Sequence, residues 1–408
     1  MVTGQFSDSF PPIIDGVALT VKNYREELEK ILGPAFAVVP ACPGAERGGA
    51  ADGDKGRVIR YLSLPAVGRA PYRLGLPRCD PALRAALLSR RFDLVHAHSP
   101  FAAGRLALRL AQRRGIPLVA TFHSKYRDNL KGALPVPALV DWEIRRIVDF
   151  FSRADQVWIP TAESLEVLRD YGFRGKAELV PHGVDLTSPA DPAALRRRAD
   201  RLLSTKAGDT VLLYVGQLAW EKNLRFLVRV LAALRRRGCV FTVSFVGEGY
   251  AAAGLEALVR SQGLAEVSRF TGVIRDRKTL SACYARAQLL LFPSLYDTCG
   301  LVVREAAVFG LPALLLRGSA AAAGVKDGVN GFLTDCSERA YAERLMVLLD
   351  HPGLLTRAGA GARRTLCRSW HQVAREVKER YLELASSRPK RAAGPGAAWA
   401  YSSTMPRK

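Results

Sequence analysis

Two acidic residues, Asp297 and Glu305, lie eight positions apart in the stretch of this sequence that is best suited to chemistry. An apolar run, Leu289–Phe292, precedes them and predicts a buried strand, which Pro293 and Ser294 end. A helix is expected to follow and to carry the second acid about two turns below the first. Because a helix N-terminus presents free N–H groups and the positive end of its dipole, the stretch predicts a phosphate site with a carboxylate at its mouth.

The residues between the two acids have the types expected at such a turn. Asp297 and Thr298 have side chains that cap helix N-termini, and the helix is expected to begin near Leu301. Gly300 lets a ligand approach the backbone closely, because glycine has no Cβ. Cys299 lies in the same loop, where no base is evident beside it, so we expect it to offer its backbone rather than a nucleophile.

This stretch resembles the acid–seven residues–glutamate motif of the retaining glycosyltransferases of family 4. That family has the GT-B fold, an α/β architecture of two Rossmann-like domains that face each other across a cleft. The resemblance implies that Asp297 meets the donor sugar and that Glu305 binds the ribose of a nucleotide sugar. It also implies that the turn holds the donor diphosphate, through Thr298, Cys299, Gly300 and Leu301. Family members more often have glutamate first, so Asp297 is one methylene shorter than usual. An ordinary surface helix with two solvated acids is the alternative.

Two histidines follow expected strands in a β–α–β unit over residues 92–126. The strands are expected at Leu94–Ala97 and Leu118–Phe122, and His98 and His123 come directly after them. Ligands of open α/β sheets bind at these carboxyl ends. The T-F-H context of His123 resembles the family position that faces the donor sugar and diphosphate, which implies a catalytic role. For His98 a simple structural hydrogen bond is equally compatible with the sequence.

Further cationic and glycine positions resemble the family's donor site. Lys222 follows a strand and Gly216, so its compact charge is placed to contact a phosphate. Family members usually have arginine after that glycine, whereas this chain has Gln217. The resemblance therefore implies that one cationic contact to the diphosphate is missing or comes from elsewhere. Gly16 ends a Pro-x-x-x-Gly turn at the head of the chain, where relatives bring a glycine close to the donor phosphates.

The order of these motifs predicts two domains and a returning helix. We expect an acceptor domain over residues 1–185, ending in the P-H-G-V-D turn, and a nucleotide-sugar domain over residues 186–370. Residues 371–387 are expected to form a helix that crosses back to the first domain. The tail at 388–408 is rich in Gly, Pro and Ala and basic, which predicts disorder. The D-G-V-N-G-F stretch at 327–332 matches the family, while the alanines at 320–323 replace polar residues common in relatives.

The composition of the chain indicates the cellular compartment of the protein and the cofactors it can be expected to use. The chain has 408 residues, long enough for two α/β cores, and seven cysteines without C-x-x-C spacing. Unpaired cysteines indicate reduced thiols in a cytoplasm. No His, Cys or carboxylate cluster has metal-ligand spacing, so we expect no metal and no cofactor beyond a UDP-sugar used as the substrate. No run of 18 apolar residues exists, and the polar N-terminus does not resemble a signal peptide.

The net charge of +22 favours anionic partners. Seven arginines gather in one region of the first domain: Arg84, Arg90, Arg91, Arg105, Arg109, Arg113 and Arg114. Such a surface suits reversible attachment to the anionic inner face of the plasma membrane. A coding bias toward arginine and alanine explains the composition equally well. Nucleic-acid-binding motifs are missing from the sequence, so we expect no specific nucleic-acid partner.

Together these features predict an enzyme that moves a hexose, expected to be glucose, from a nucleotide sugar with retention. The acceptor is open between a membrane lipid such as diacylglycerol and a soluble sugar or glycan. A hexose epimerase of similar two-domain build is an alternative, and it would need no acceptor. An inactive relative that only binds sugar nucleotides is another, which the departures at Gln217 and Ala323 support.

Overall fold

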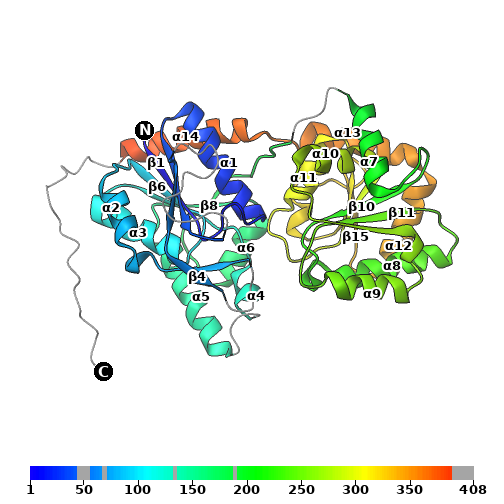
Figure 1. Ribbon diagram of the computed structural model, residues 1–408, viewed down its shortest axis with the longest axis horizontal. Helices are drawn as coiled ribbons and strands as arrows, with labels where there is room; N and C mark the ends of the chain where they lie inside the picture. Colours follow the sequence, from blue (N-terminus) through cyan, green and yellow to red (C-terminus); the bar gives the residue numbers. More distant parts are fainter. Residues whose placement is uncertain (44–55, 67–70, 132–135, 187–190, 388–408) are drawn as a thin grey trace. The chain divides into compact units, whose positions relative to one another are not determined.

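The computed structural model describes residues 1–43, 56–66, 71–131, 136–186 and 191–387 (Figure 1). The basic tail expected to be disordered lies outside these residues. The chain divides into two compact units. One comprises residues 1–121, 146–157 and the C-terminal segment from 374, and the other comprises residues 122–145 and 158–373. The domain boundaries expected at residues 185, 370 and 387 remain predictions.

The first sheet has seven strands in the order β3-β2-β1-β6-β7-β8-β9. Its pairings are parallel, as in doubly wound α/β folds, and the order changes direction between β1 and β6. These strands are short, and β1, β2, β6 and β7 are buried along their whole length, as expected for a sheet covered on both faces. Their bounds are β1 Thr3–Phe6, β2 Ala35–Pro40, β3 Val58–Tyr61, β6 Leu94–Ala97, β7 Leu118–Thr121, β8 Gln156–Ile159 and β9 Glu178–Leu179.

Helices alternate with these strands along the chain. Helix α3, for example, buries the apolar stripe that contains Leu106 and Leu110 and ends at Gly115, whose left-handed backbone caps it. The helices of this part of the chain are α1 Gly16–Ile31, α2 Pro81–Leu88, α3 Ala102–Arg114, α4 Tyr126–Lys131, α5 Pro137–Ser152 and α6 Ala162–Asp170, and α14 Trp370–Ser387 ends the described chain.

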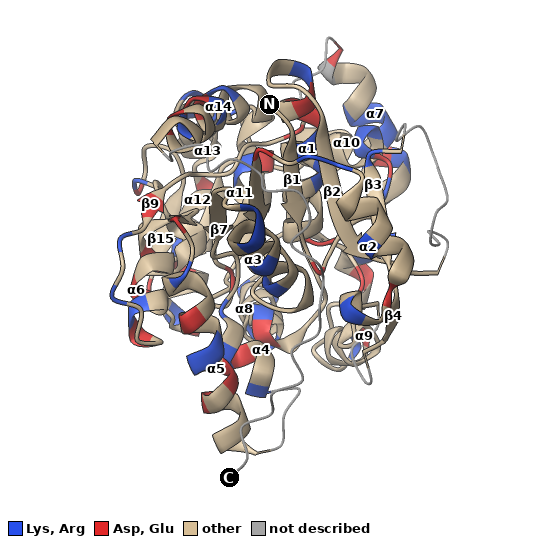
Figure 2. Ribbon diagram, turned by 90° about the vertical axis from the view of Figure 1, so that its left-hand side faces the viewer, with Lys and Arg blue, Asp and Glu red and all other residues tan. Residues whose placement is uncertain are grey.

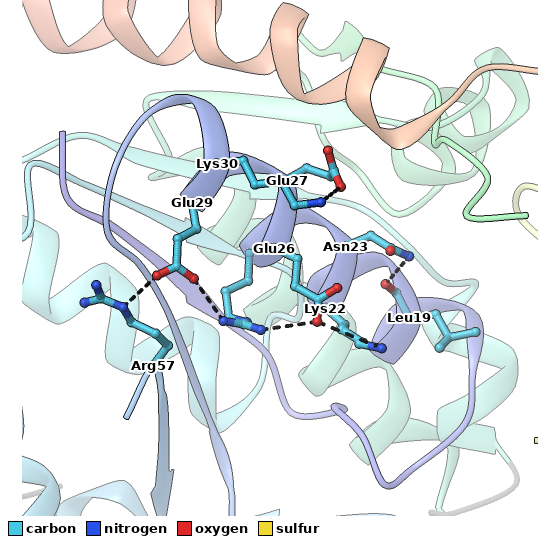
Figure 3. Close-up of polar contacts among 9 residues, drawn as sticks. Leu19, Lys22, Asn23, Glu26, Glu27, Glu29, Lys30 and Arg57 are labelled. Carbon is cyan, nitrogen blue, oxygen red and sulfur yellow. Dashed lines mark hydrogen bonds and ion pairs between the residues drawn. The ribbon is translucent and has the colours of Figure 1, made fainter. Parts of the chain in front are cut away.

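Helix α1 carries a chain of ion pairs on its polar face (Figure 3). Arg25 is buried and contacts both Glu26 and Glu29, each at 3.2 Å. Glu29 also accepts a hydrogen bond from Arg57 Nε at 2.8 Å, which links the helix to the chain just before β3. The charges of this helix therefore neutralise one another and contribute little to a basic surface.

One segment of the first unit forms a small two-stranded sheet of its own. Strands β4 (Ser63–Pro65) and β5 (Arg73–Gly75) pair antiparallel, and a short 3₁₀ helix η1 (Pro77–Cys79) follows. The Arg73 guanidinium fixes this pair, donating to Ser63 Oγ and Ser63 O at 3.1 Å each. Strands of three residues are too short to show a hydrophobic period, which is why the sequence pattern does not predict them.

The second sheet has six parallel strands in the order β12-β11-β10-β13-β14-β15. Its order changes direction between β10 and β13, so the loops after these two strands diverge at one point of the sheet edge. A ligand of an open α/β sheet is expected there. The bounds are β10 Val211–Val215, β11 Thr242–Val246, β12 Ser268–Gly272, β13 Leu289–Phe292, β14 Ala313–Leu316 and β15 Phe332–Thr334.

The helices around this sheet are amphipathic. In α8, Leu224, Leu227, Leu231 and Leu234 recur with the helical period and are fully buried. The helices are α7 Pro192–Leu203, α8 Leu224–Arg236, α9 Ala252–Ser261, α10 Arg277–Arg286, α11 Leu301–Val308, α12 Glu338–Asp350 and α13 Pro352–Thr365, with 3₁₀ turns η2 Trp220–Lys222, η3 Ala265–Val267 and η4 Ala320–Ala322. All seven cysteines are free thiols. Within the described residues, no helix combines the length and the apolarity needed to cross a bilayer.

Candidate functional site

The two predicted donor-site residues of opposite charge meet where the second sheet changes direction. Lys222 ends the 3₁₀ turn after β10, and Asp297 lies in the loop after β13. Lys222 Nζ donates to Asp297 Oδ1 at 2.6 Å, and the side chains are only 12% and 21% exposed. Lys222 also lies over the ring of Tyr296, 5.1 Å from its centroid. The switch point therefore holds one shielded cation and one shielded carboxylate.

The second carboxylate oxygen of Asp297 has no partner among the described residues. Oδ2 is buried and accepts no hydrogen bond there, although a carboxylate has about four acceptor positions. Burial, together with the nearby charge of Asp297, raises the pKa of the Tyr214 hydroxyl well above its usual value. The Tyr214 phenol therefore stays protonated and donates to Gln217 O at 3.0 Å. Asp297 thus keeps an acceptor position for a ligand hydroxyl.

Glycines bring the loops after β10 and β11 into backbone contact. A Cβ at Gly247 would lie 1.9 Å from Gly216 O, and one at Gly249 would lie 2.4 Å from Leu218 O. Leu218 N donates to Glu248 O at 2.9 Å, which joins the two loops. Only glycine permits this approach. The joined loops fix the backbone that leads to Lys222, while the side chain of Gln217 is exposed beside it.

Helix α11 begins at Leu301, as the sequence predicts, but its cap differs from the expected one. Its N-cap is Gly300, in a left-handed conformation with φ of 58°, and neither Asp297 nor Thr298 caps it. A Cβ at Gly300 would lie 2.8 Å from the backbone of Ala321, so the alanine run at 320–323 packs against this turn. Leu301 is the first residue of the helix, and its N-terminal amides follow directly on Asp297. The expected capping role of Asp297 and Thr298 is wrong, because a left-handed glycine turns the chain instead.

Thr298 instead joins the loop to the segment that holds His123. Its Oγ1 donates to His123 O at 2.5 Å. Its carbonyl accepts from Thr161 Oγ1 at 3.1 Å and Ser164 Oγ at 3.3 Å, at the start of α6. Thr161 also caps α6, since its Oγ1 accepts from the backbone amide of Ser164. These bonds place His123 and Asp297 within one hydrogen-bonded assembly.

His123 stacks on a second histidine, which belongs to the P-H-G-V-D turn and which the sequence pattern marks as part of a domain boundary rather than of the site. The rings of His123 and His182 lie 5.0 Å apart, and His182 Nε2 is 3.2 Å from His123 Nδ1. Burial, and secondarily the charge of Arg304, lowers the pKa of His182 to about 3. His182 is therefore neutral. If its Nε2–H donates to His123, the proton of a neutral His123 lies on Nε2.

The remaining histidine of the sequence analysis has a structural role. His98 is fully buried, and its Nε2 lies 2.8 Å from Gln5 Oε1 of β1. Its neighbour His96 lies between Tyr381 and Thr121, at 2.6 and 2.7 Å. Of the two roles that the sequence leaves open for His98, the structure therefore supports the structural hydrogen bond, which lies within the first unit.

Glu305 lies on α11 with both carboxylate oxygens engaged. Tyr284 donates its hydroxyl to Oε2 at 2.7 Å, and Arg277 Nη2 donates to Oε1 at 2.8 Å. Burial, with the charge of Glu305, raises the pKa of Tyr284, so the phenol remains a donor. Arg277 is the first residue of α10, and Tyr284 lies within the same helix. Neither residue has a sequence signal that points to Glu305. Each carboxylate oxygen still has a further acceptor position.

The other predicted positions are placed as follows. Cys299 is buried, and this burial raises the pKa of its thiol, so it stays protonated and is not an activated nucleophile. Gly16 is the first residue of α1, capped by Asp15, and belongs to the other compact unit. In the described parts of the chain, no group of three His, Cys, Asp or Glu residues is arranged to hold a metal ion.

Comparison with known proteins identifies the two halves of the chain. Residues 14–188 match the family described as Glycosyltransferase Family 4, and residues 195–365 match Glycosyl transferases group 1. The chain is 24% identical to the alpha-monoglucosyldiacylglycerol synthase of Streptococcus pneumoniae, over 77% of this chain and 70% of that protein. It is 32% identical to a D-inositol 3-phosphate glycosyltransferase of Kineococcus radiotolerans, over 73% of both chains.

Solved structures agree on the fold. A sucrose-phosphate synthase of Thermosynechococcus elongatus superposes with a TM-score of 0.80 at 20% identity, covering 94% of this chain and 99% of the other. Anabaena HepE in complex with UDP-glucose gives a TM-score of 0.70 at 19% identity, covering 94% and 99%. These likenesses confirm the GT-B architecture of two parallel-sheet α/β domains. The chain therefore belongs to the family 4 glycosyltransferases, as the spacing of Asp297 and Glu305 suggests.

Proposed function

We propose that this glycosyltransferase moves glucose from UDP-glucose to a membrane lipid such as diacylglycerol, with retention of configuration and without a metal ion. The names of relatives support the sugar and the acceptor class, since two of them are alpha-monoglucosyldiacylglycerol synthases. The complexes of HepE with UDP and UDP-glucose support the donor. Retention is proposed from the resemblance of the Asp297–Glu305 motif to that of retaining enzymes.

The Lys222–Asp297 pair carries the proposal. Its two members lie at the switch point of the second sheet, where a nucleotide is expected to bind. A donor diphosphate has more negative charge than one carboxylate, so it competes for the Lys222 ammonium. When Lys222 turns to the phosphate, Asp297 is left to accept from a hydroxyl of the donor sugar, using the buried Oδ2 that has no partner among the described residues.

The departing diphosphate needs fixed positive charge, and this chain supplies it in two forms. The first turn of α11 presents backbone N–H groups and the positive end of the helix dipole. Lys222 adds a full charge. Donors that are held in place before the reaction stabilise developing charge without having to reorganise. This positive charge replaces both a metal ion and the arginine that relatives usually have at the position of Gln217.

His123 is the proposed donor to the reacting sugar. The neutral His182 stacks on His123 and contacts its Nδ1, which keeps the imidazole of His123 oriented. A hydrogen bond to the sugar that strengthens as the glycosidic bond breaks lowers the barrier. We propose no covalent step, because Asp297 accepts a hydrogen bond from a hydroxyl of the donor sugar.

A lipid acceptor fits the basic surface of the first unit. Arg114 of α3 donates to Arg90 O and Leu87 O at 2.7 and 2.6 Å, which ties the carboxyl ends of α2 and α3 together. Figure 2 shows basic residues along α3. We propose that this surface holds the protein reversibly on the inner face of the plasma membrane, each cation contributing about 1 kcal/mol.

A soluble acceptor is the second candidate function. It is favoured by the relatives named D-inositol 3-phosphate glycosyltransferase and glycogen synthase. The test measures UDP release from UDP-glucose with diacylglycerol vesicles, with inositol phosphate and with glycogen. Release that depends on the vesicles supports the lipid, and release that depends on a soluble acceptor overturns it. Release that needs no acceptor, together with an isomerised sugar, indicates an epimerase.

Membrane attachment is tested by cosedimentation with anionic and neutral vesicles at low and high salt. The full chain and a chain ending at Ser387 are compared. Pelleting only with anionic vesicles, reduced by salt in both chains, supports the arginine surface of α2 and α3. Loss of pelleting on truncation places attachment in the C-terminal tail, and equal pelleting with both lipids shows that the charge is compositional.

A further inference from the structure

Arg277 links the carboxylate of Glu305 to a second carboxylate. It is the first residue of α10, and its Nη2 contacts both Glu305 Oε1, at 2.8 Å, and Asp185 Oδ1. Two carboxylates that share one guanidinium nitrogen lie close together, and without the cation they would repel each other. Arg277 therefore neutralises a like-charge pair that the fold itself creates.

The second carboxylate has a fixed position. Asp185 follows Val184, whose amide donates to Arg368 O at 2.8 Å, and Val184 bridges to Ser369 in parallel register. Through Arg277, the side chain of Glu305 is thus held relative to a backbone segment that lies outside α11. Tyr284 holds the opposite oxygen of the same carboxylate. The two contacts leave Glu305 one orientation, with the unused acceptor positions facing away from both partners.

We propose that Arg277 is a positioning residue for ribose recognition: it holds the Glu305 carboxylate in the orientation that accepts the ribose hydroxyls of the donor. This inference rests on the proposed function, in which Glu305 binds the ribose. Removal of the guanidinium has two effects. Glu305 loses the contact that fixes its orientation, and it faces the uncompensated negative charge of Asp185, so its carboxylate turns away from the ribose.

The test uses a nucleotide that lacks the hydroxyls concerned. Calorimetry compares UDP with 2′,3′-dideoxyuridine diphosphate. The native protein is expected to prefer UDP by about 10-fold or more, because a hydrogen bond to a charged group contributes about 1.5–3 kcal/mol. Arg277→Met is expected to reduce this preference to within about 2-fold by weakening UDP alone. Glu305→Gln gives the same loss, and the double variant is no worse than either, because both act on one contact.

Control variants separate positioning from a general loss of structure. Arg229→Met removes an exposed ion pair with Glu338 in the same unit and is expected to leave the preference unchanged. Asp185→Asn keeps the guanidinium but removes the carboxylate that anchors it. Its preference for UDP is therefore expected to lie between that of the native protein and that of Arg277→Met. This variant also serves if Arg277→Met does not fold. Arg277→Lys keeps the charge but lacks the planar guanidinium whose Nη2 contacts both carboxylates, and it is expected to retain only part of the preference for UDP.

The possible results are distinct. If Arg277→Met weakens UDP and the dideoxy nucleotide equally, Arg277 does not act through the ribose and the inference is overturned. If the native protein binds UDP but does not distinguish the two nucleotides, Glu305 does not bind the ribose and the inference also fails. If the native protein binds neither nucleotide, the proposed function itself is contradicted.

Discussion

Lys222 Nζ lies 2.6 Å from Asp297 Oδ1, although the two residues are 75 positions apart and follow different strands. The contact exists because β10 and β13 are neighbours in the second sheet. The two side chains neutralise each other's charge in a shielded position. In the proposed function, this pair is the resting state of the site, and Lys222 is the cation that meets the diphosphate.

Lys222→Ala is expected to reduce kcat by about 100-fold with UDP-glucose, because it removes a fixed cation from the leaving diphosphate. It also leaves Asp297 without its partner, so UDP binding weakens further through charge repulsion. Steady-state kinetics of UDP release measure both effects. Lys206→Ala, at an exposed lysine of the same unit, is the matched control. Unchanged turnover in a folded Lys222→Ala protein would show that the diphosphate lies elsewhere.

His123→Ala is expected to lower kcat by about 100-fold while changing the affinity for UDP-glucose only slightly. A hydrogen bond that forms fully only as the glycosidic bond breaks contributes to turnover rather than to binding. Kinetics give kcat and KM, and calorimetry gives the donor affinity separately. His98→Gln, at the buried structural histidine, controls for a general loss of stability. A raised KM with normal kcat would make His123 a ground-state contact.

The pKa of about 3 for His182 predicts a pH dependence of stability. In the unfolded chain this histidine has a pKa near 6.5. Below that pH the unfolded state therefore binds a proton at His182 that the folded state does not bind. The free energy of unfolding therefore falls as the pH drops from 6.5 toward 3, by about 1.4 kcal/mol per pH unit for this group.

Denaturant unfolding of the native protein and of His182→Gln at several pH values checks this. The stability difference between the two proteins should narrow as the pH falls from 6.5 to 4.5. A difference that stays constant over this window would mean that His182 is protonated in the folded state.

Activity is expected to survive excess EDTA. The N-terminus of α11 and Lys222 supply the positive charge that a metal would otherwise bring to the diphosphate. The assay compares UDP release before and after chelation, and again after Mg²⁺ or Mn²⁺ is added. A fall to background that either ion reverses would contradict the electrostatic account.

The sequence predicts the local parts of this site better than its long-range contacts. The apolar run Leu289–Phe292 and the glycine at 300 predict a strand, a turn and a helix, because each signal acts within a few residues. The Lys222–Asp297 contact depends on strand order, which hydrophobic periodicity does not determine. The capping prediction for Asp297 is wrong for a related reason, since its carboxylate pairs with a distant lysine instead.

The partners of Glu305 and His123 show the same limit. Arg277 lies 28 positions from Glu305, and His182 lies 59 positions from His123. Arg277 lies in no motif that points to Glu305, and the P-H-G-V-D turn that contains His182 does not point to His123. Only the packing of α10 against α11 and of the segment at 182 against that at 123 brings the groups together. Short elements such as α4 and β5 are missed because six and three residues carry too little of a repeating pattern.

The central claim, hexose transfer with retention from UDP-glucose, is tested most directly by proton NMR of the reaction. Purified protein is incubated with UDP-glucose and diacylglycerol vesicles, and the anomeric signals are followed over time. The account predicts that UDP and an α-glucoside of the lipid appear together at equal rates, and that Asp297→Ala abolishes both. A β-glucoside, or no product with any lipid or soluble acceptor from protein that binds UDP, would contradict it.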